Sequence, residues 1–84
     1  MLLGWLNLTK MKTKKQILAY FKEEIIQASY NIQYYNYKNQ DSAKLNSNKS
    51  MKKIIDICKN IGIEQDLVLT WINEGEITLI KDIS

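Results

Sequence analysis

The longest regular pattern of apolar positions lies between residues 13 and 38. Apolar side chains recur there at alternating spacings of three and four, at Leu18, Phe21, Ile25, Ala28, Ile32 and Tyr35. This spacing places them in a heptad seam on one face of an α-helix. Thr13 precedes the pattern and has the hydroxyl that favours the N-terminal cap position. The pattern therefore predicts one long helix over 13–38.

A second apolar stripe runs along another face of the same predicted helix, at Ile26, Tyr30, Tyr34 and Tyr37. A helix that is apolar on two faces requires two packing partners. The rest of the chain can supply one, and a second copy can supply the other. We therefore expect a homodimer through the first seam, at Leu18, Phe21, Ile25, Ile32 and Tyr35. The alternative is that both stripes pack within one monomeric core.

Two shorter helical patterns follow, from residue 50 to 75. Ile54, Ile57, Cys58 and Ile61 share one helical face, and Leu67, Val68, Trp71 and Ile72 share another. Gly62 is expected to end the first helix and Gly75 the second, because glycine adopts the conformation that closes a helix. Helices this short cannot bury their apolar faces alone, so we expect them to pack on each other across the turn and on a third element.

The remaining segments complete the expected fold. Residues 39–49 are polar and predict a loop, with Ser50 capping the next helix, and residues 1–12 form an N-terminal segment. Apolar and polar residues alternate over 76–83 and over Trp5–Thr9, which predicts two strands that pair. We therefore expect one mainly α domain over 1–84, with helix-turn-helix and C-terminal strand over 50–84 and a small two-stranded sheet, as in a reduced winged helix.

The stretch Ser50–Ile77 resembles the helix-turn-helix family. Cys58 is the small residue of the first helix and Gly62 is the turn, and the apolar slots are filled by Ile57, Ile61, Ile63, Val68 and Trp71. Trp71–Ile77 looks like the end of the recognition helix and the start of the wing in the excisionase and MerR-like branch. The resemblance implies DNA binding, with the Leu67–Asn73 helix entering a major groove.

Candidate binding residues come from three places. They are Gln65, Asp66, Leu69, Thr70 and Asn73 on the second short helix, Lys52, Lys53 and Lys59 on the first, and Lys12, Lys14 and Lys15 before the long helix. Gln65, Thr70 and Asn73 could read base edges, and the lysines could contact phosphates. An exposed Leu69 suits a thymine methyl group or a protein partner.

The distribution of charge qualifies the DNA-binding hypothesis. The chain has 12 lysines and no arginine, a net charge of +3 and a pI near 9.0. Eight lysines and three acids in residues 1–49 give +5, whereas four lysines and six acids in 50–84 give −2. A DNA-binding half is normally the basic half, and Glu64 and Asp66 would repel phosphates at the start of the recognition helix.

The sequence contains no histidine, no glycine-rich phosphate loop and no catalytic constellation, so we expect no enzyme and no cofactor. A lone cysteine, Cys58, is expected to be a buried thiol and holds neither a disulfide nor a metal cluster. The opening apolar run is too short to span a membrane, and its lysines follow it, so a cytoplasmic protein is expected.

Two hypotheses remain. The first is a small DNA-binding protein, an accessory or transcriptional regulator of a phage, plasmid or other mobile element. The alternative is a non-enzymatic protein–protein interaction module, such as a small inhibitor, an anti-defence protein or a subunit of a larger assembly. The acidic second helix favours the alternative, and the match to the helix-turn-helix slots favours DNA.

Overall fold

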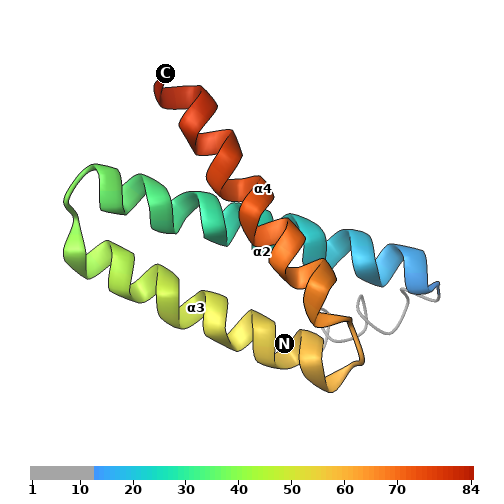
Figure 1. Cartoon of the computed structure of the whole chain (residues 1–84). Helices are drawn as coiled ribbons and strands as arrows, with labels where there is room; N and C mark the ends of the chain where they lie inside the picture. The colour runs from blue at the N-terminus through green and yellow to red at the C-terminus, as the bar shows by residue number, and fades with distance from the viewer. Residues whose placement is uncertain (1–12) are drawn as a thin grey trace.

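The computed structural model describes residues 13–84, and these form three α-helices (Figure 1). They are α2 (Lys14–Tyr37), α3 (Asp41–Asn60) and α4 (Gln65–Ile83). A tight turn joins α2 to α3, so these two helices run antiparallel, and α4 crosses α2. The protein is therefore mainly α, as predicted, and this part of the chain contains no strand.

Helix α2 confirms the predicted long helix and its cap. Thr13 has an extended backbone, and its hydroxyl accepts a hydrogen bond from the Gln16 backbone N–H at 3.2 Å. This bond satisfies one of the amide groups that have no partner in the first turn of a helix. The turn after Tyr37 places Asn39 in the left-handed region, at φ 57°, which asparagine tolerates better than most residues.

Helix α3 begins at Asp41, so the predicted polar loop over 39–49 and the predicted cap at Ser50 are wrong. Asn and Ser residues have modest helix propensity, which tertiary contacts readily override. Here α3 packs along α2, and the Lys44 ammonium donates a hydrogen bond to Asn36 Oδ1 at 2.8 Å. Asp41 in the first turn also suits the positive end of the helix dipole.

Helix α4 continues through Gly75 to Ile83, so the predicted helix end and the predicted strand over 76–83 are wrong. The two-stranded sheet therefore does not form, since one of its strands is helical. The other proposed strand, Trp5–Thr9, lies outside the described residues. The buried positions Val68, Trp71, Gly75 and Leu79 follow the helical spacing without interruption. The alternating pattern after Gly75 was therefore coincidental.

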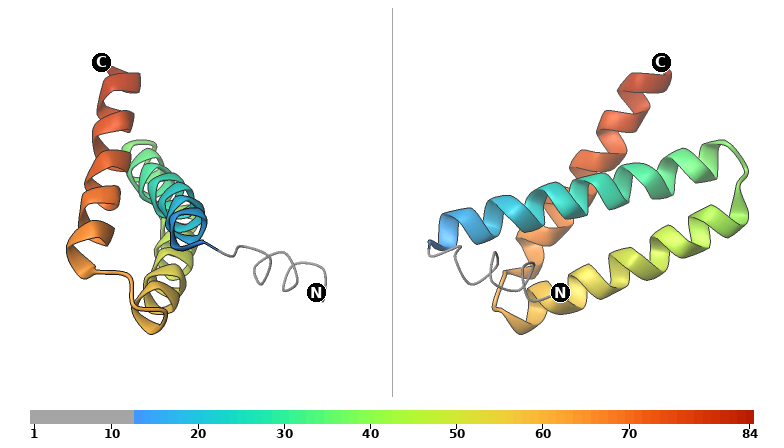
Figure 2. Two further views of the ribbon diagram at one scale, coloured as in Figure 1. Left: turned by 90° about the vertical axis from the view of Figure 1, so that its right-hand side faces the viewer. Right: turned by 180° about the vertical axis from the view of Figure 1, so that it is seen from behind.

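The hydrophobic core lies around α2, because α3 and α4 both pack against it and make few contacts with each other (Figure 2). Ile25 at the centre of α2 is fully buried. The expected packing of the two shorter helices on a third element is therefore confirmed, whereas their expected packing on each other is slight. The buried apolar residues are Phe21, Ile25, Ala28, Met51, Cys58, Val68, Trp71 and Leu79.

Because α3 packs on α2, the residues of α3 that face inwards differ from those predicted from the sequence. Cys58 is buried as predicted, but Ile57 and Ile61 are exposed, and Met51 is buried in their place. The face of α3 is set by its contact with α2, which selects the row through Met51, Ile55 and Cys58.

The seam proposed for a homodimer lies largely inside the protein. Phe21 and Ile25 are buried in the chain's own core, and the half-buried Leu18 and Ile32 pack against that core. Tyr35 is half-buried as well. The apolar seam of α2 is therefore largely covered by α3 and α4 of the same chain, whereas Tyr34 and Tyr37 of the second stripe are exposed.

Helices α2 and α4 approach each other most closely at Ser29 and Gly75. A Cβ atom added to Gly75 would lie 2.6 Å from the Ile26 carbonyl oxygen and 2.7 Å from Ser29 Cβ. The buried Ser29 hydroxyl donates a hydrogen bond to the Ile72 carbonyl oxygen at 2.5 Å. Gly75 is therefore required by the close approach of two backbones, and it does not end the helix.

We predict that Gly75→Ala destabilises the protein by about 1–3 kcal/mol, because the added methyl group meets backbone and Cβ atoms that cannot rotate away. This cost outweighs the gain of about 1 kcal/mol that alanine brings to a helix interior. Chemical denaturation followed by circular dichroism measures the change. Asn73→Ala, at an exposed position of the same helix, is the control and should be neutral or stabilising. A Gly75→Ala protein as stable as the wild type would contradict the close approach.

We also predict that Cys58 reacts with a thiol reagent far more slowly in the native protein than in the denatured one. The side chain is fully buried, and burial raises the pKa of the Cys58 thiol, which lowers the fraction of reactive thiolate. A Cys58→Ala/Leu69→Cys protein provides an exposed thiol for comparison and should react rapidly. Equal rates for Cys58 before and after denaturation would place it on the surface.

Candidate interaction surface

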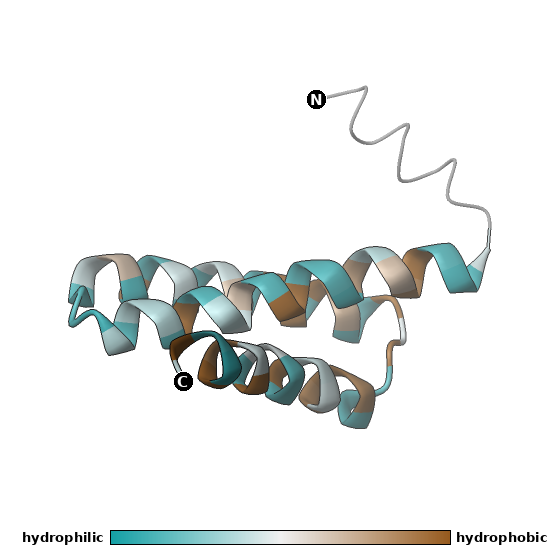
Figure 3. Cartoon of the chain, turned by 90° about the horizontal axis from the view of Figure 1, so that it is seen from above, coloured by the Kyte–Doolittle hydropathy of each residue, from teal (hydrophilic) through white to brown (hydrophobic). Residues whose placement is uncertain are grey.

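The outer face of α4 exposes several large apolar side chains. The inner face holds Val68, Trp71, Gly75 and Leu79 against α2, so residues on the opposite side point to solvent. Figure 3 shows apolar positions along α4 up to its C-terminal end. Four of them remain about half exposed: Leu69 at 53%, Ile77 at 44%, Ile80 at 59% and Ile83 at 43%.

We define the α4 outer face as these four residues together with Asp66, Thr70, Asn73 and Glu76. Helix α4 carries four carboxylates against one lysine, a net charge of −3. Helix α3 has the opposite balance, with five lysines against two aspartates and a net charge of +3. The protein therefore presents an acidic apolar helix and a basic helix, although the whole chain is basic.

The structure brings together most of the candidate binding residues predicted on α4. Gln65, Asp66, Leu69, Thr70 and Asn73 are all exposed. All except Gln65 lie on the α4 outer face. The Thr70 hydroxyl already donates a hydrogen bond to the Asp66 carbonyl oxygen at 2.9 Å, so it is engaged within the helix.

The C-terminal half of this face was not predicted, because residues 76–83 were expected to form a strand. Glu76, Ile80 and Ile83 extend the helical row begun by Leu69 and Asn73. Their spacings of four, three, four and three residues were the signal that could have revealed them.

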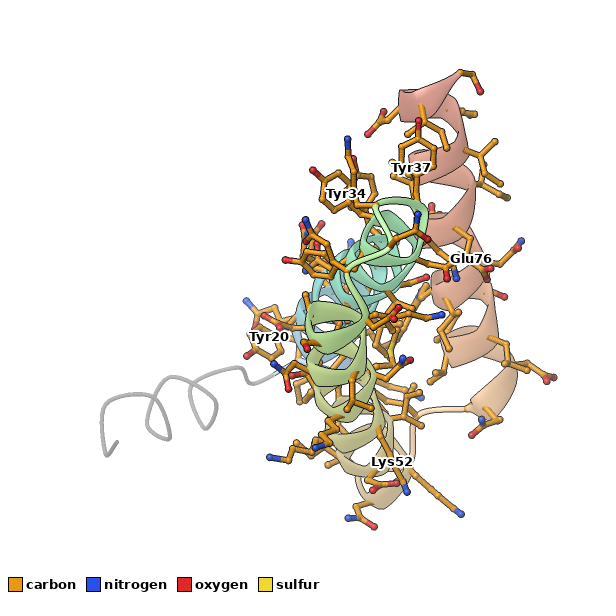
Figure 4. The ribbon with its side chains drawn as sticks, turned by 90° about the vertical axis from the view of Figure 1, so that its left-hand side faces the viewer. Tyr20, Tyr34, Tyr37, Lys52 and Glu76 are labelled. Carbon is orange, nitrogen blue, oxygen red and sulfur yellow. The ribbon has the colours of Figure 1, made fainter. Side chains whose placement is uncertain are left out.

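A groove lies beside this row, between the C-terminal halves of α2 and α4. It has a volume of ≈ 220 Å³ and is lined by Gln33, Asn36, Tyr37, Glu76, Leu79, Ile80 and Ile83. Figure 4 shows Tyr37 of α2 close to α4, and Glu76 on α4 itself. A cavity of about 150 Å³ holds a benzene ring, so the groove can accept one large apolar side chain.

A hydrogen bond between side chains ties the end of α4 to α2. The Tyr30 hydroxyl donates to Asp82 Oδ2 at 2.8 Å, and this hydrogen bond raises the pKa of Tyr30. The Tyr30 ring stacks on Tyr34, with centroids 6.5 Å apart, and the Lys38 ammonium lies 5.9 Å from the Tyr34 centroid. The tyrosine stripe of α2 therefore packs locally and anchors α4.

The described candidate lysines lie on other helices than the candidate residues of α4. Lys52, Lys53 and Lys59 are exposed on α3, whereas Lys14 and Lys15 are exposed at the start of α2. Lys12 lies outside the described residues. Figure 4 shows Lys52 on α3, near the bottom of the view, and Glu76 on α4.

Within residues 13–84, no group of three or more Cys, Asp or Glu side chains is placed to hold a metal ion. None of the three helices is both long and apolar enough to cross a membrane.

Comparison with protein-family models, with curated proteins and with solved structures finds no match. The helix-turn-helix resemblance of Ser50–Ile77 therefore stays a prediction.

We predict that Tyr30→Phe loosens the last turns of α4 while the rest of the helix stays protected. The substitution removes the only side-chain hydrogen bond that the structure shows between Asp82 and α2. Amide hydrogen exchange should quicken around residues 80–83 and remain unchanged around Trp71. Tyr34→Phe is the matched control. Equal exchange in both variants would show that the Tyr30–Asp82 bond does not hold the helix end.

Proposed function

We propose that this protein is a non-enzymatic protein-interaction module that binds its partner through the α4 outer face. The observation that carries the proposal is a helix with four half-exposed aliphatic residues on the face opposite its buried side. Single apolar residues are normal on a surface, but several on one helix, at either side of the polar Asn73 and Glu76, favour an interaction site.

The shape of the site favours a helical or extended protein segment as the ligand. From Leu69 to Ile83 the face is about 21 Å long at helical rise, which equals about four turns of a partner helix. The row is apolar at its two ends, and Glu76 and Asn73 lie at its centre. Such a combination of apolar anchors with polar positions is typical of helix-in-groove recognition.

The charge of α4 argues against a groove of DNA as the ligand. Glu64 and Asp66 lie at the start of the helix, where phosphates would approach it, and Glu74 and Glu76 follow further along. Each carboxylate repels the phosphate backbone and opposes the release of counterions that drives such binding. Ile77 and Ile80 carry no group that could hydrogen-bond to a base edge, and Leu69 could contact only a thymine methyl group.

DNA binding is the second candidate function, and one observation favours it. Helix α3 exposes Lys49, Lys52, Lys53 and Lys59, which could contact phosphates without α4. In that case α3 would lie along the DNA backbone, and the protein would act as the accessory regulator expected from the helix-turn-helix resemblance. An inhibitor, an anti-defence protein or an assembly subunit would instead use α4.

We predict that a photo-cross-linking residue at Leu69 or Ile80 captures protein in the cells that make this chain, whereas one at Tyr20 does not. Tyr20 is the matched control because it is also a partly exposed apolar residue but lies on α2. Mass spectrometry identifies whether each adduct is another protein or a second copy, and either supports the proposal.

A parallel titration separates this function from the second candidate. Wild-type protein should show no salt-sensitive binding to mixed duplex DNA. Salt-sensitive binding that weakens on Lys52→Gln and Lys53→Gln, together with equal cross-linking from Tyr20 and Leu69, would overturn the proposed function in favour of DNA.

A further inference from the structure

We propose that the partner of the α4 outer face is helix α3 of a second copy of this chain, so that copies associate head to tail. This inference rests on the proposed function, since it names the partner for the same face. It starts from two exposed rows of residues in one molecule, one acidic and one basic.

The row on α4 is a heptad seam. Leu69, Asn73, Glu76, Ile80 and Ile83 follow one another at spacings of four, three, four and three residues. This spacing is the one that packs against a second helix as a continuous seam. Only the half-buried Glu76 carries a charge within it.

The row on α3 has a similar length and the opposite charge. Lys49, Lys53, Ile57 and Ile61 recur at four-residue spacing and all four are exposed. Ile57 and Ile61 are 47% and 50% exposed, although the sequence pattern placed both in the core. They are therefore aliphatic residues that the described part of their own chain leaves about half exposed.

The two rows are complementary in charge, and each contains a four-residue step from a charged residue to an aliphatic one, Glu76 to Ile80 and Lys53 to Ile57. When Lys53 of one copy is placed opposite Glu76 of another and the helices run parallel, Ile57 falls opposite Ile80, and Ile61 lies close to Ile83. When the helices run antiparallel, only Ile61 falls near Leu69, and Ile80 lies opposite Lys49. The parallel arrangement therefore places aliphatic contacts beside the central ion pair, as in helix pairs whose partners are selected by charge.

A symmetric contact between two α4 helices is disfavoured by the same charges. Such a contact would place two helices of net charge −3 against each other, with Glu76 of one copy close to Glu76 of the other. Like charges opposed in an interface cost several kcal/mol, whereas α3, at +3, is complementary. In the proposed contact, the α4 outer face of one copy binds the α3 row of another. The resulting dimer still has one free α3 row and one free α4 outer face, so association continues into a ring or an open chain.

The test uses the full chain and two variants, each of which blocks one surface. Variant A carries Leu69→Asp and Ile80→Asp on α4, and variant B carries Lys53→Glu and Ile57→Asp on α3. All four positions are exposed, so the fold should persist, and circular dichroism checks it. Sedimentation and light scattering then give the mass of each protein alone and of an equimolar mixture.

Wild-type protein should form species larger than a dimer as its concentration rises. Each variant alone should remain a monomer of 9.9 kDa, apart from the small mass change of the substitutions. Their mixture should form a 1:1 dimer and nothing larger, since A keeps an intact α3 row and B an intact α4 row. Thr78→Asp, at an exposed α4 position outside the outer face, is the control and should associate as the wild type does.

A charge exchange provides a second measurement. Glu76→Lys and Lys53→Glu should each weaken association about tenfold or more, and the chain carrying both should recover most of the wild-type affinity. A merely structural effect of either substitution would not be reversed by the other.

Three results would overturn the proposal. A wild-type chain that stays monomeric at all concentrations excludes a second copy, and α4-specific cross-links to a different protein would then preserve the proposed function. Self-association of variant B but not of A indicates a contact between two α4 helices. Self-association of both variants places the contact elsewhere, for example on α2.

Discussion

The close approach of α2 and α4 at Ser29 and Gly75 determines how the surface of this protein is arranged. Because α3 and α4 make few contacts with each other, the orientation of α4 depends on its contact with α2. The glycine removes the Cβ atom that would separate the helices, and the Ser29 hydroxyl bonds to the Ile72 carbonyl oxygen beside it. With Gly75 held inwards, the helical repeat turns Leu69 and Ile80 outwards.

A central helix that is apolar on two faces packs against both of the other helices. Helix α2 uses Phe21, Ile25 and Ala28 to build the core, and its tyrosines stack on one another and bond to Asp82. Helices α3 and α4 are each covered on one side only. Their outer faces therefore carry the exposed aliphatic residues and the separated charges, +3 on α3 and −3 on α4.

The helix-turn-helix resemblance and the structure agree at some positions and differ at others. Cys58, Val68 and Trp71 are buried, and Gly62 adopts the left-handed conformation at φ 85° that the turn requires. Ile57 and Ile61, however, point to solvent. An amphipathic helix can fill apolar slots in several rotations, so a match of residue types does not establish which face is buried.

The sequence by itself determined α2 with its Thr13 cap and the burial of Cys58, Val68 and Trp71, because helical periodicity and capping are local properties of the chain. Only the tertiary structure decided the rest. Glycine both ends helices and permits close packing, and the choice at Gly75 depends on Ser29, a residue distant in sequence. The polar start of α3 is helical because it packs along α2, and that contact also selects Met51 over Ile57 for the core. The acidic apolar face of α4 extends to Ile83 for the same reason, since α2 provides the surface that keeps the helix intact beyond Gly75.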